Sequence, residues 1–264
     1  ANMIDESIIL SQLPKRMPYS HKGSYGKALM IGGSMAMHGA LTLAAKACIQ
    51  SGIGTLTLMV PDCISSILAM KLEECMLLSA PSKDGYFDEQ AISLLKEVIP
   101  QYDFIVIGNG MGRSDTCRKM VEAVLQSDKP CIIDGDVIYL AAQCDIPQHK
   151  AILMTPHVKE MCYLCHLEMK EMLAQPFEIV TSYVQQYPNV TIVYKDAFSL
   201  IANTKEANFY YQPNTALAKE GSGDVLCGII AGMYGQSKDL LKATCCGVYL
   251  HSHCAIETSG AISV

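Results

Sequence analysis

Short apolar runs alternate with longer stretches of helical pattern along this chain. Seven of the runs are apolar over four to six residues, several are rich in β-branched residues, and most are flanked by Gly, Pro or Asp, which is typical of buried strands. The predicted strands cover residues 27–31, 55–60, 104–107, 131–134, 152–155, 191–194 and 199–202.

Five stretches between and after these runs have the features of helices. The first is rich in Ala and stops at Gly52, and the third stops before Pro188. The predicted helices cover residues 39–51, 116–127, 177–187, 222–234 and 240–257. Near-continuous apolar strands that alternate with helices predict an α/β fold, in which helices cover both faces of a mostly parallel sheet. Such sheets bind ligands at the carboxyl ends of their strands.

Composition and charge argue against a disordered, nucleic-acid-binding or membrane protein. The 264 residues are 50% hydrophobic and 17% charged, which excludes a disordered chain. The formal net charge is −6, so we expect neither a nucleic acid nor an anionic membrane as the main partner, since both attract basic surfaces. No apolar run reaches the roughly 18 residues of a membrane span. Residues 1–16 contain Asp5 and Glu6 and no long apolar stretch, so we expect no secretory signal.

The twelve cysteines lie largely within apolar runs. Buried thiols in a reducing cytoplasm explain this pattern better than a disulfide framework, so we predict a cytoplasmic protein. Residues 162–166 (CYLCH) have the spacing of covalent haem attachment, but two cysteines three apart also share one face of a helix, and we favour that interpretation. His251, His253 and Cys254 suggest zinc, yet a second well-spaced pair of ligands is not evident.

The strongest motif is the segment 214–224 (NTALAKEGSGD), which opens a long apolar helix punctuated by Gly. Gly221, Ser222 and Gly223 are small, so backbone N–H groups can approach an anion closely there, and the helix N-terminus adds partial positive charge. Asp224 follows in the first turn. It either complements the helix dipole or acts as a general base that takes a proton from an attacking hydroxyl.

Further blocks accompany this motif in a fixed order along the chain. They are residues 22–34, 39–40, 108–112, 134–136, 155–160 and 193–196. With them the chain resembles the ADP/ATP-dependent NAD(P)H-hydrate dehydratases of the ribokinase-like superfamily, over about residues 22 to 253. The resemblance implies a ribokinase-like three-layer α/β/α sandwich. We expect a single domain over residues 1–264, with residues 1–21 as an N-terminal extension and without the epimerase domain that is fused to many relatives.

The resemblance implies a repair reaction on nicotinamide nucleotides. NADH or NADPH that has been hydrated on its nicotinamide ring is phosphorylated on the new hydroxyl by ADP or ATP with Mg²⁺, and phosphate then leaves. Phosphate is a good leaving group where hydroxide is a poor one, and the ring nitrogen can expel it. Such a reaction needs a base, an anion hole and a metal. The family pattern leans toward ADP as donor and leaves NADH and NADPH hydrate equally open.

The resemblance also implies roles for individual residues. Asp224 is the expected catalytic base, and the expected anion hole is Gly221, Ser222 and Gly223. The residues expected at the hydrated dinucleotide are Ala40, Gly110, His157 and Asp224. The residues expected at the adenine nucleotide are Lys195, Asp196, Ala197, Phe198, Ser199 and Gly223. Glu160 is expected at the metal.

Several of these positions also have a purely structural interpretation. His157 follows Thr-Pro and could cap a helix, and Lys195 could be a solvated strand end. The glycines 32–33 could simply end a strand tightly. Asp134 and Asp136 follow a predicted strand and could form a metal or water site, or cap the next helix.

The chain departs from the family pattern at a few positions. Glu220 and Asp196 stand where Gly is usual, and carboxylates there should repel a polyphosphate. Asn109 stands where Pro is common, and Pro213 and Thr215 could stiffen the loop between them. Three functions therefore stay open: the dehydratase, which we favour, a ribokinase-like kinase of a vitamin precursor, and a divergent non-catalytic nucleotide-binding protein. The resemblance further implies a homo-oligomer, most often a tetramer.

Overall fold

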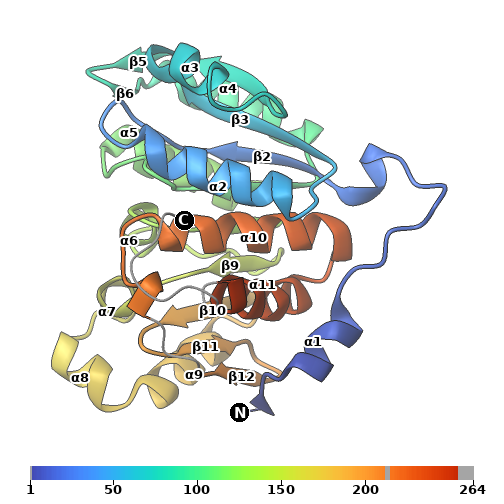
Figure 1. Cartoon of the computed structure of the whole chain (residues 1–264). Helices are drawn as coiled ribbons and strands as arrows, with labels where there is room; N and C mark the ends of the chain where they lie inside the picture. The colour runs from blue at the N-terminus through green and yellow to red at the C-terminus, as the bar shows by residue number, and fades with distance from the viewer. Residues whose placement is uncertain (1, 212–214, 255–264) are drawn as a thin grey trace.

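A ten-stranded sheet forms the centre of the protein, as a computed structural model of residues 2–211 and 215–254 shows (Figure 1). Its strands lie in the order β1 (Asn2–Met3), β12 (Ala207–Tyr210), β11 (Ser199–Ala202), β10 (Val190–Lys195), β9 (Ile152–Met154), β8 (Cys131–Ile133), β7 (Phe104–Ile107), β2 (Lys27–Ile31), β3 (Thr55–Pro61) and β4 (Met76–Ala80). All neighbours run parallel except that β11 is antiparallel to β10 and β12. The predicted α/β sandwich with a mostly parallel sheet is confirmed.

Helices cover both faces of this sheet. One face carries α4 (Gln90–Val98), α5 (Asp115–Gln126), α6 (Val137–Ala141), α7 (Val158–Cys165), α8 (Met169–Ala174) and α9 (Pro176–Gln186). The other carries α1 (Glu6–Gln12), α2 (His38–Gln50), α3 (Asp62–Ala69), α10 (Ser222–Ser237) and α11 (Leu240–Cys254). Short 3₁₀ turns occupy Lys22–Tyr25, Ile99–Gln101 and Thr215–Leu217. A small hairpin, β5 (Ser82–Lys83) and β6 (Tyr86–Phe87), follows β4.

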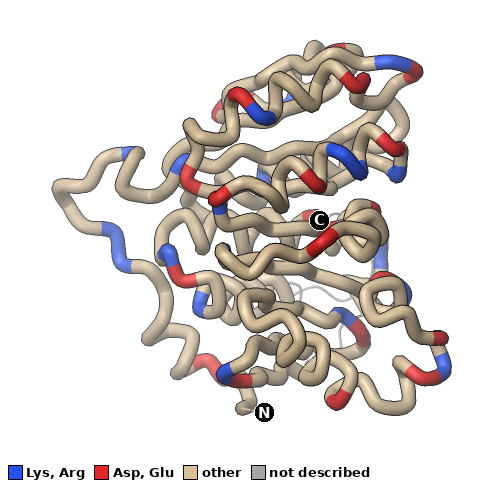
Figure 2. Tube along the Cα trace, turned by 180° about the vertical axis from the view of Figure 1, so that it is seen from behind, with Lys and Arg blue, Asp and Glu red and all other residues tan. Residues whose placement is uncertain are grey.

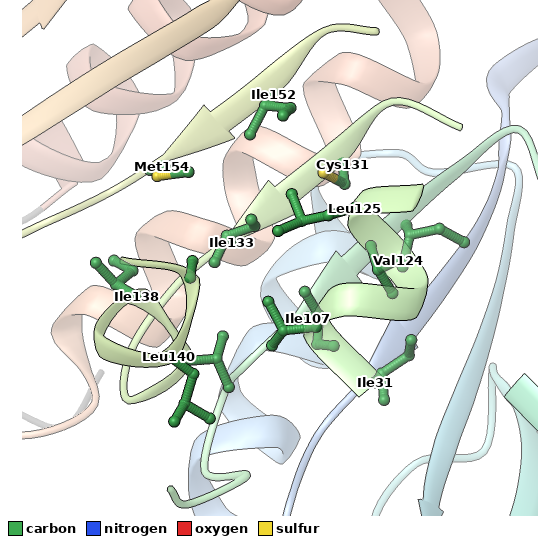
Figure 3. Packing of buried hydrophobic residues seen from close by; sticks show 14 of the residues in the cluster. Ile31, Ile107, Val124, Leu125, Cys131, Ile133, Ile138, Leu140, Ile152 and Met154 are labelled. Carbon is green, nitrogen blue, oxygen red and sulfur yellow. The ribbon is translucent and has the colours of Figure 1, made fainter. Parts of the chain in front are cut away.

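Two hydrophobic cores hold the three layers together, because successive side chains of a strand point to opposite faces. On β2, for example, Leu29 and Ile31 enter the core under α4 and α5, whereas Ala28 and Met30 enter the core under α2 and α10. Figure 3 shows the first of these cores, with residues of β7, β8 and β9 packed against α5 and α6. The near-continuous apolar strands of the sequence are thus buried on both faces.

Helix α10 lies unusually close to α2, and the two are adjacent in Figure 1. A Cβ atom on Gly228 would lie 2.1 Å from the carbonyl oxygen of Ala44, and one on Gly232 would lie 2.6 Å from that of Cys48. Only Gly lets two helix backbones approach this far. These glycines therefore fix the position of α10, whose first turn carries Asp224.

All seven predicted strands and all five predicted helices are present, with ends that differ by up to three residues. The end of the last predicted helix, residues 255–257, lies outside the described residues. Strands β1, β4 and β12, the β5–β6 hairpin and helices α1, α3, α4, α6 and α8 were not predicted. The helical interpretation of residues 162–166 is confirmed. Residues 162–166 belong to the end of α7 and its cap, and the twelve cysteines, all within the described residues, are unpaired thiols.

The predicted N-terminal extension is tied to the body of the protein. β1 pairs with β12, and Ile9 of α1 is fully buried against the core of α10 and α11. Elsewhere on the surface, basic and acidic residues are interspersed over helices and loops (Figure 2). Among the described residues, no helix is long and apolar enough to cross a membrane.

Candidate active site

The loops that follow β7, β8, β9 and β10 meet the first turn of α10 at the carboxyl edge of the sheet. Five side chains from these segments come together there: Asn109, Asp134, Thr155, Lys195 and Asp224. Parallel strands place these loops on the same edge, which is where α/β sheets bind ligands. Four of the sequence blocks, residues 108–112, 134–136, 155–160 and 193–196, thus meet the 214–224 motif in space.

The start of α10 has the geometry expected of an anion site. Gly221 adopts a φ of +88°, which turns the chain into the helix, and a Cβ there would lie 2.5 Å from the Leu43 side chain. The Cβ position of Gly223 lies 3.3 Å from Lys195 Nζ, so the ammonium group stands beside the first turn. The positive end of the helix and Lys195 therefore act on the same space. Asn214, at the start of the motif, lies outside the described residues.

Asp224 projects from this turn onto Asn109. The Asn109 Nδ2 group donates a hydrogen bond of 2.8 Å to Asp224 Oδ1. Burial raises the pKa of Asp224 to about 6, and the negative charge of Asp134 adds to the rise, whereas the Asn109 hydrogen bond and the charge of Lys195 oppose it. A carboxylate with a pKa near 6 is ionised at neutral pH and is a stronger base than an ordinary aspartate.

Asp134 is fully engaged by neighbouring side chains. Its Oδ2 accepts from Asn109 at 2.9 Å, and its Oδ1 accepts from the Thr155 hydroxyl and from Lys195 Nζ, the latter at 3.3 Å. Asp136 pairs instead with Arg113 at 2.7 Å. These contacts favour a structural role for both aspartates over the metal site that the sequence left open.

His157 caps α7, and Glu160 completes the cap. The His157 Nδ1 atom accepts from the backbone N–H groups of Lys159 and Glu160, and Glu160 Oε2 accepts from the His157 N–H at 2.9 Å. This is a capping box with His in place of Ser or Thr. Burial raises the pKa of Glu160 to about 7. Its Oε1 lies 3.3 Å from His157 Nε2, so a metal at Glu160 would have to compete with the cap.

His157 nevertheless stays at the edge of the cluster. It is bridged through its backbone to Lys195, and its ring is half-exposed. Burial and the charge of Lys195 lower the pKa of His157, which keeps the ring neutral at physiological pH. Because Nδ1 accepts two hydrogen bonds, the neutral ring carries its hydrogen on Nε2, which lies 3.3 Å from Glu160 Oε1.

Ala40 of α2 and Gly110, which follows Asn109 in the loop after β7, lie next to each other. A Cβ on Gly110 would lie 3.1 Å from the Ala40 Cβ and 2.2 Å from the Met37 carbonyl oxygen. The structure thus brings together two residues that the sequence assigned to one ligand. At the start of α10, Ser222 Oγ lies 3.1 Å from Nε2 of His251, which joins α11 to the same turn.

Residues 196–198 form the turn between β10 and β11 directly after Lys195, and Ser199 begins β11 and pairs with Lys195. The Phe198 ring packs against Phe177, Tyr194 and Phe209, with ring centroids 5.2–5.8 Å apart, so this side chain supports the turn from within the protein. Asp196 is exposed and accepts from the Ala197 N–H at 2.8 Å. Glu220 is exposed as well. Neither acidic residue is buried beside the expected polyphosphate position.

Two residues of the cluster, Asn109 and Thr155, and the neighbouring His251 were not predicted as site residues. Asn109 was noted only as a departure from the family pattern, and Thr155 and His251 only as parts of weaker motifs. The polar residue types at strand ends gave a signal for Asn109 and Thr155, but their partners lie 21 to 115 residues away in sequence and are revealed only by the fold. Among the described residues, His, Cys, Asp and Glu side chains do not form a group of three that could hold a metal ion.

Comparison with known proteins identifies the family of this chain. The family described as NAD(P)H-hydrate dehydratase matches residues 28–263. The ADP-dependent (S)-NAD(P)H-hydrate dehydratase of Listeria monocytogenes is 33% identical over 247 residues, which are 91% of this chain and 83% of that protein. The chain spans only about half the length of several other curated relatives, which are named as bifunctional NAD(P)H-hydrate repair enzymes.

Solved structures give the same result for the fold. A ribokinase-like superfamily protein from Enterococcus faecalis superposes with a TM-score of 0.86 at 28% identity, over 99% of this chain and 90% of that one. The ADP/ATP-dependent NAD(P)H-hydrate dehydratase of Bacillus subtilis, co-crystallised with ATP and Mg²⁺, has a TM-score of 0.85 at 28% identity, over 96% and 88%. The sequence match and the shared ribokinase-like fold agree, and the chain belongs to the NAD(P)H-hydrate dehydratase family.

Proposed function

We propose that this protein restores hydrated NADH or NADPH to the intact dinucleotide, with ADP or ATP as phosphoryl donor and Asp224 as the general base. The observation that carries the proposal is the position of Asp224. It lies in the first turn of α10, directly after the glycine entry, with Lys195 beside that entry and a pKa of about 6. A base, a cation and a helix N-terminus are the groups that phosphoryl transfer requires.

In the first step, Asp224 accepts the proton of the ring hydroxyl as the hydroxyl oxygen attacks the terminal phosphorus of the donor. The new O–P bond forms while the bond to the leaving nucleotide breaks, which yields AMP from ADP or ADP from ATP. Lys195 and the N–H groups at the start of α10 attract the transferring phosphoryl oxygens. These groups are held by the fold before the substrate arrives, so little reorganisation is needed.

In the second step, the lone pair of the ring nitrogen expels phosphate with breakage of the C–O bond. Loss of a ring proton to water then restores the dihydronicotinamide. The site has only to keep the departing phosphate at Lys195 and the α10 entry until the C–O bond has broken. His157, with its Nε2 hydrogen at the edge of the cluster, and the Ala40–Gly110 pair are our candidates for holding the dinucleotide.

We further propose that Mg²⁺ enters bound to the nucleotide. Mg²⁺ keeps several waters and is commonly held by one or two carboxylates together with substrate phosphates. Asp134 and Glu160 are engaged in hydrogen bonds within the protein, which supports a metal carried by the donor over a resident one. When bound, the metal would neutralise phosphate charge. We also propose a cytoplasmic homo-oligomer, most often a tetramer in this family, and light scattering of the purified protein would measure its mass.

The test is turnover of hydrated NADH with Mg²⁺ and either ADP or ATP, followed by the return of reduced-nicotinamide absorbance. Asp224→Asn should lower kcat by about 10²–10⁴-fold, because the amide cannot accept the proton, while adenine nucleotide still binds. Asp145→Asn, which changes an exposed carboxylate in the loop before β9 at the other edge of the sheet, should leave kcat unchanged. Turnover by Asp224→Asn at the wild-type rate would contradict the assignment.

The products separate this proposal from the other functions of the same fold. Recovery of NADH together with free phosphate supports the dehydratase. A stable phosphorylated product would instead identify a small-molecule kinase. Nucleotide binding without any phosphate release, in folded protein, would identify a non-catalytic binding protein.

A further inference from the structure

Asn109 is a buried amide that lies between the two carboxylates of the cluster. It is fully buried, and its Nδ2 group donates to Asp134 Oδ2 at 2.9 Å and to Asp224 Oδ1 at 2.8 Å. Its Oδ1 atom lies 3.6 Å from the thiol sulfur of Cys227, which donates to it. The Nδ2 and Oδ1 atoms of the side chain thus both have partners, which come from the residue that follows β8 and from α10.

The orientation of this amide is fixed by charge. If the group turned over, its carbonyl oxygen would face two carboxylates and its N–H groups would face a thiol. Burial raises the pKa of Cys227 well above its ordinary value, so the thiol keeps its hydrogen and remains the donor. Only the orientation with both N–H groups toward Asp134 and Asp224 satisfies all three partners.

The backbone of Asn109 is held as firmly as its side chain. The Gly33 N–H donates to the Asn109 carbonyl oxygen at 2.8 Å, and a Cβ on Gly32 would lie 2.5 Å from that oxygen. Gly108 and Gly110 on either side have φ values of +133° and +68°. The end of β2 therefore holds the loop after β7 in place, and the amide cannot move away from the carboxylates.

The two carboxylates differ in how well they are neutralised. Asp134 accepts from Thr155 and pairs with Lys195 in addition to Asn109. The Asp224 carboxylate, by contrast, accepts one hydrogen bond from the residues that the structure describes, and its donor is Asn109. Only Oδ1 of Asp224 is used in that bond, which leaves Oδ2 for a substrate proton.

We propose that Asn109 is a positioning residue that orients the Asp224 carboxylate and keeps it ionised, with Asp134 and Lys195 as its anchor. The inference rests on the proposed role of Asp224 as the base and assigns a function to a residue at which this chain departs from the family pattern. Its N–H groups separate two negative charges that would otherwise repel each other across the site. The amide itself transfers no proton.

The charges around Asp224 agree with this role. Asp134 from the end of β8 and burial raise the pKa of Asp224, and Asn109 and Lys195 from β10 lower it. On α10 itself the nearby titratable group is the neutral Cys227 thiol, and α11 contributes His251, which burial keeps neutral above a pH of about 4. Helix α2 meets α10 through Ala44, Ala47 and Cys48. Loss of the Asn109 bond should therefore raise the pKa of Asp224.

The experiment compares Asn109→Ala and Asn109→Asp with wild type in the pH dependence of kcat/KM. The acid limb of the wild type should lie near pH 6, the pKa of Asp224. In Asn109→Ala it should move up by about one to two pH units, because a hydrogen bond to a charged group is lost. Asn109→Asp keeps the shape of the side chain but replaces its N–H donor by a third carboxyl group. The acid limb of this variant should therefore move up at least as far as that of Asn109→Ala.

Cys227→Ala is the matched control. It removes a contact of the same amide and a side chain of the same core, but it leaves both N–H bonds to the carboxylates. Its melting temperature should fall while its acid limb stays at the wild-type pH. Two results would overturn the proposal: the acid limb shifts as far in Cys227→Ala as in Asn109→Ala, or it shifts in neither variant. Either result would mean that Asn109 only fills space.

A second readout does not require turnover. The carboxyl ¹³C signal of Asp224 in labelled protein, assigned with Asp224→Asn, reports its pKa directly. An upward shift in Asn109→Ala supports the proposal even if wild type fails to restore NADH, a result that would defeat the proposed function alone. An unshifted titration in folded Asn109→Ala would defeat the positioning role whatever the activity.

Discussion

Asp224 stands in surroundings that favour its uncharged form. Burial and the neighbouring Asp134 raise its pKa to about 6, and the Asn109 hydrogen bond and the charge of Lys195 compensate only in part. The same conflict makes the carboxylate a better base and makes the folded protein less stable when the group is ionised. Activity and stability therefore oppose each other at this residue.

Asp224→Asn should for this reason be more stable than wild type in alkaline solution. Because the folded-state pKa lies above the ordinary value of 3.8, the group's stabilising contribution is complete below pH 3.8 and is lost as the pH rises through about 6. At pH 8 the variant should gain about 1–3 kcal/mol in the free energy of unfolding, and the gain should shrink at pH 5. Thermal unfolding at both pH values measures it.

Asp145→Asn again provides the comparison, since its carboxylate is exposed. Its melting temperature should follow wild type at both pH values. An Asp224→Asn protein that melts at or below the wild-type temperature at pH 8 would show that the ionised carboxylate is not destabilising.

At the scale of elements, burial decided which strands the sequence could predict. The strands β2, β3 and β7 to β10 lie inside the sheet and are apolar on both faces, so each carries its own signal. The edge strand β4 begins with the exposed Met76, and β1 has two residues, both exposed. Their strand conformation comes from pairing with β3 and β12, which a local pattern does not contain.

The contact between α10 and α2 gives a test at this scale, because Ala has a higher helix propensity than Gly. Gly228→Ala should nevertheless destabilise the protein by about 1–3 kcal/mol, since its Cβ would lie 2.1 Å from the Ala44 carbonyl oxygen. Gly39→Ala, in α2 with no atom within 4 Å of the new Cβ, should stabilise it by up to about 1 kcal/mol. Denaturant unfolding measures both.

The two Gly→Ala substitutions should therefore change the free energy of unfolding in opposite directions. A stabilising effect of Gly228→Ala would mean that α10 can move away from α2 without loss. Gly228→Ala should also lower kcat, because a displaced α10 carries Asp224 away from Asn109 and Lys195.

At the scale of the whole molecule, the sequence predicted the layers and, over residues 1–21, an N-terminal extension, but not the structure of this arm. Its short strand and helix lack a strong local pattern, and they are ordered by β12 and by the core under α10 and α11. The sheet edge at which the candidate site lies was predictable, because parallel strands send the loops at their carboxyl ends to one edge. The hydrogen-bond partners within the site were not, because they depend on how deeply each loop is packed.

Two neighbouring residues of the arm test its contribution. Ile9 is fully buried, so Ile9→Ala should lower the free energy of unfolding by about 2–5 kcal/mol. Ile8 is 40% exposed, so Ile8→Ala should change it by less than about 1 kcal/mol. Equal losses in chemical denaturation would show that the arm is not anchored through the face that carries Ile9.

The close seating of α10 on α2 has a consequence for each catalytic cycle. Because α10 packs tightly on α2 at Gly228 and Gly232, it loses its positional entropy once, when the chain folds. The proposed base then does not have to be located again each time a substrate binds, and the activation entropy of proton transfer should be small. Only the substrates and products then have to move during a cycle, while α10 and Asp224 stay in place.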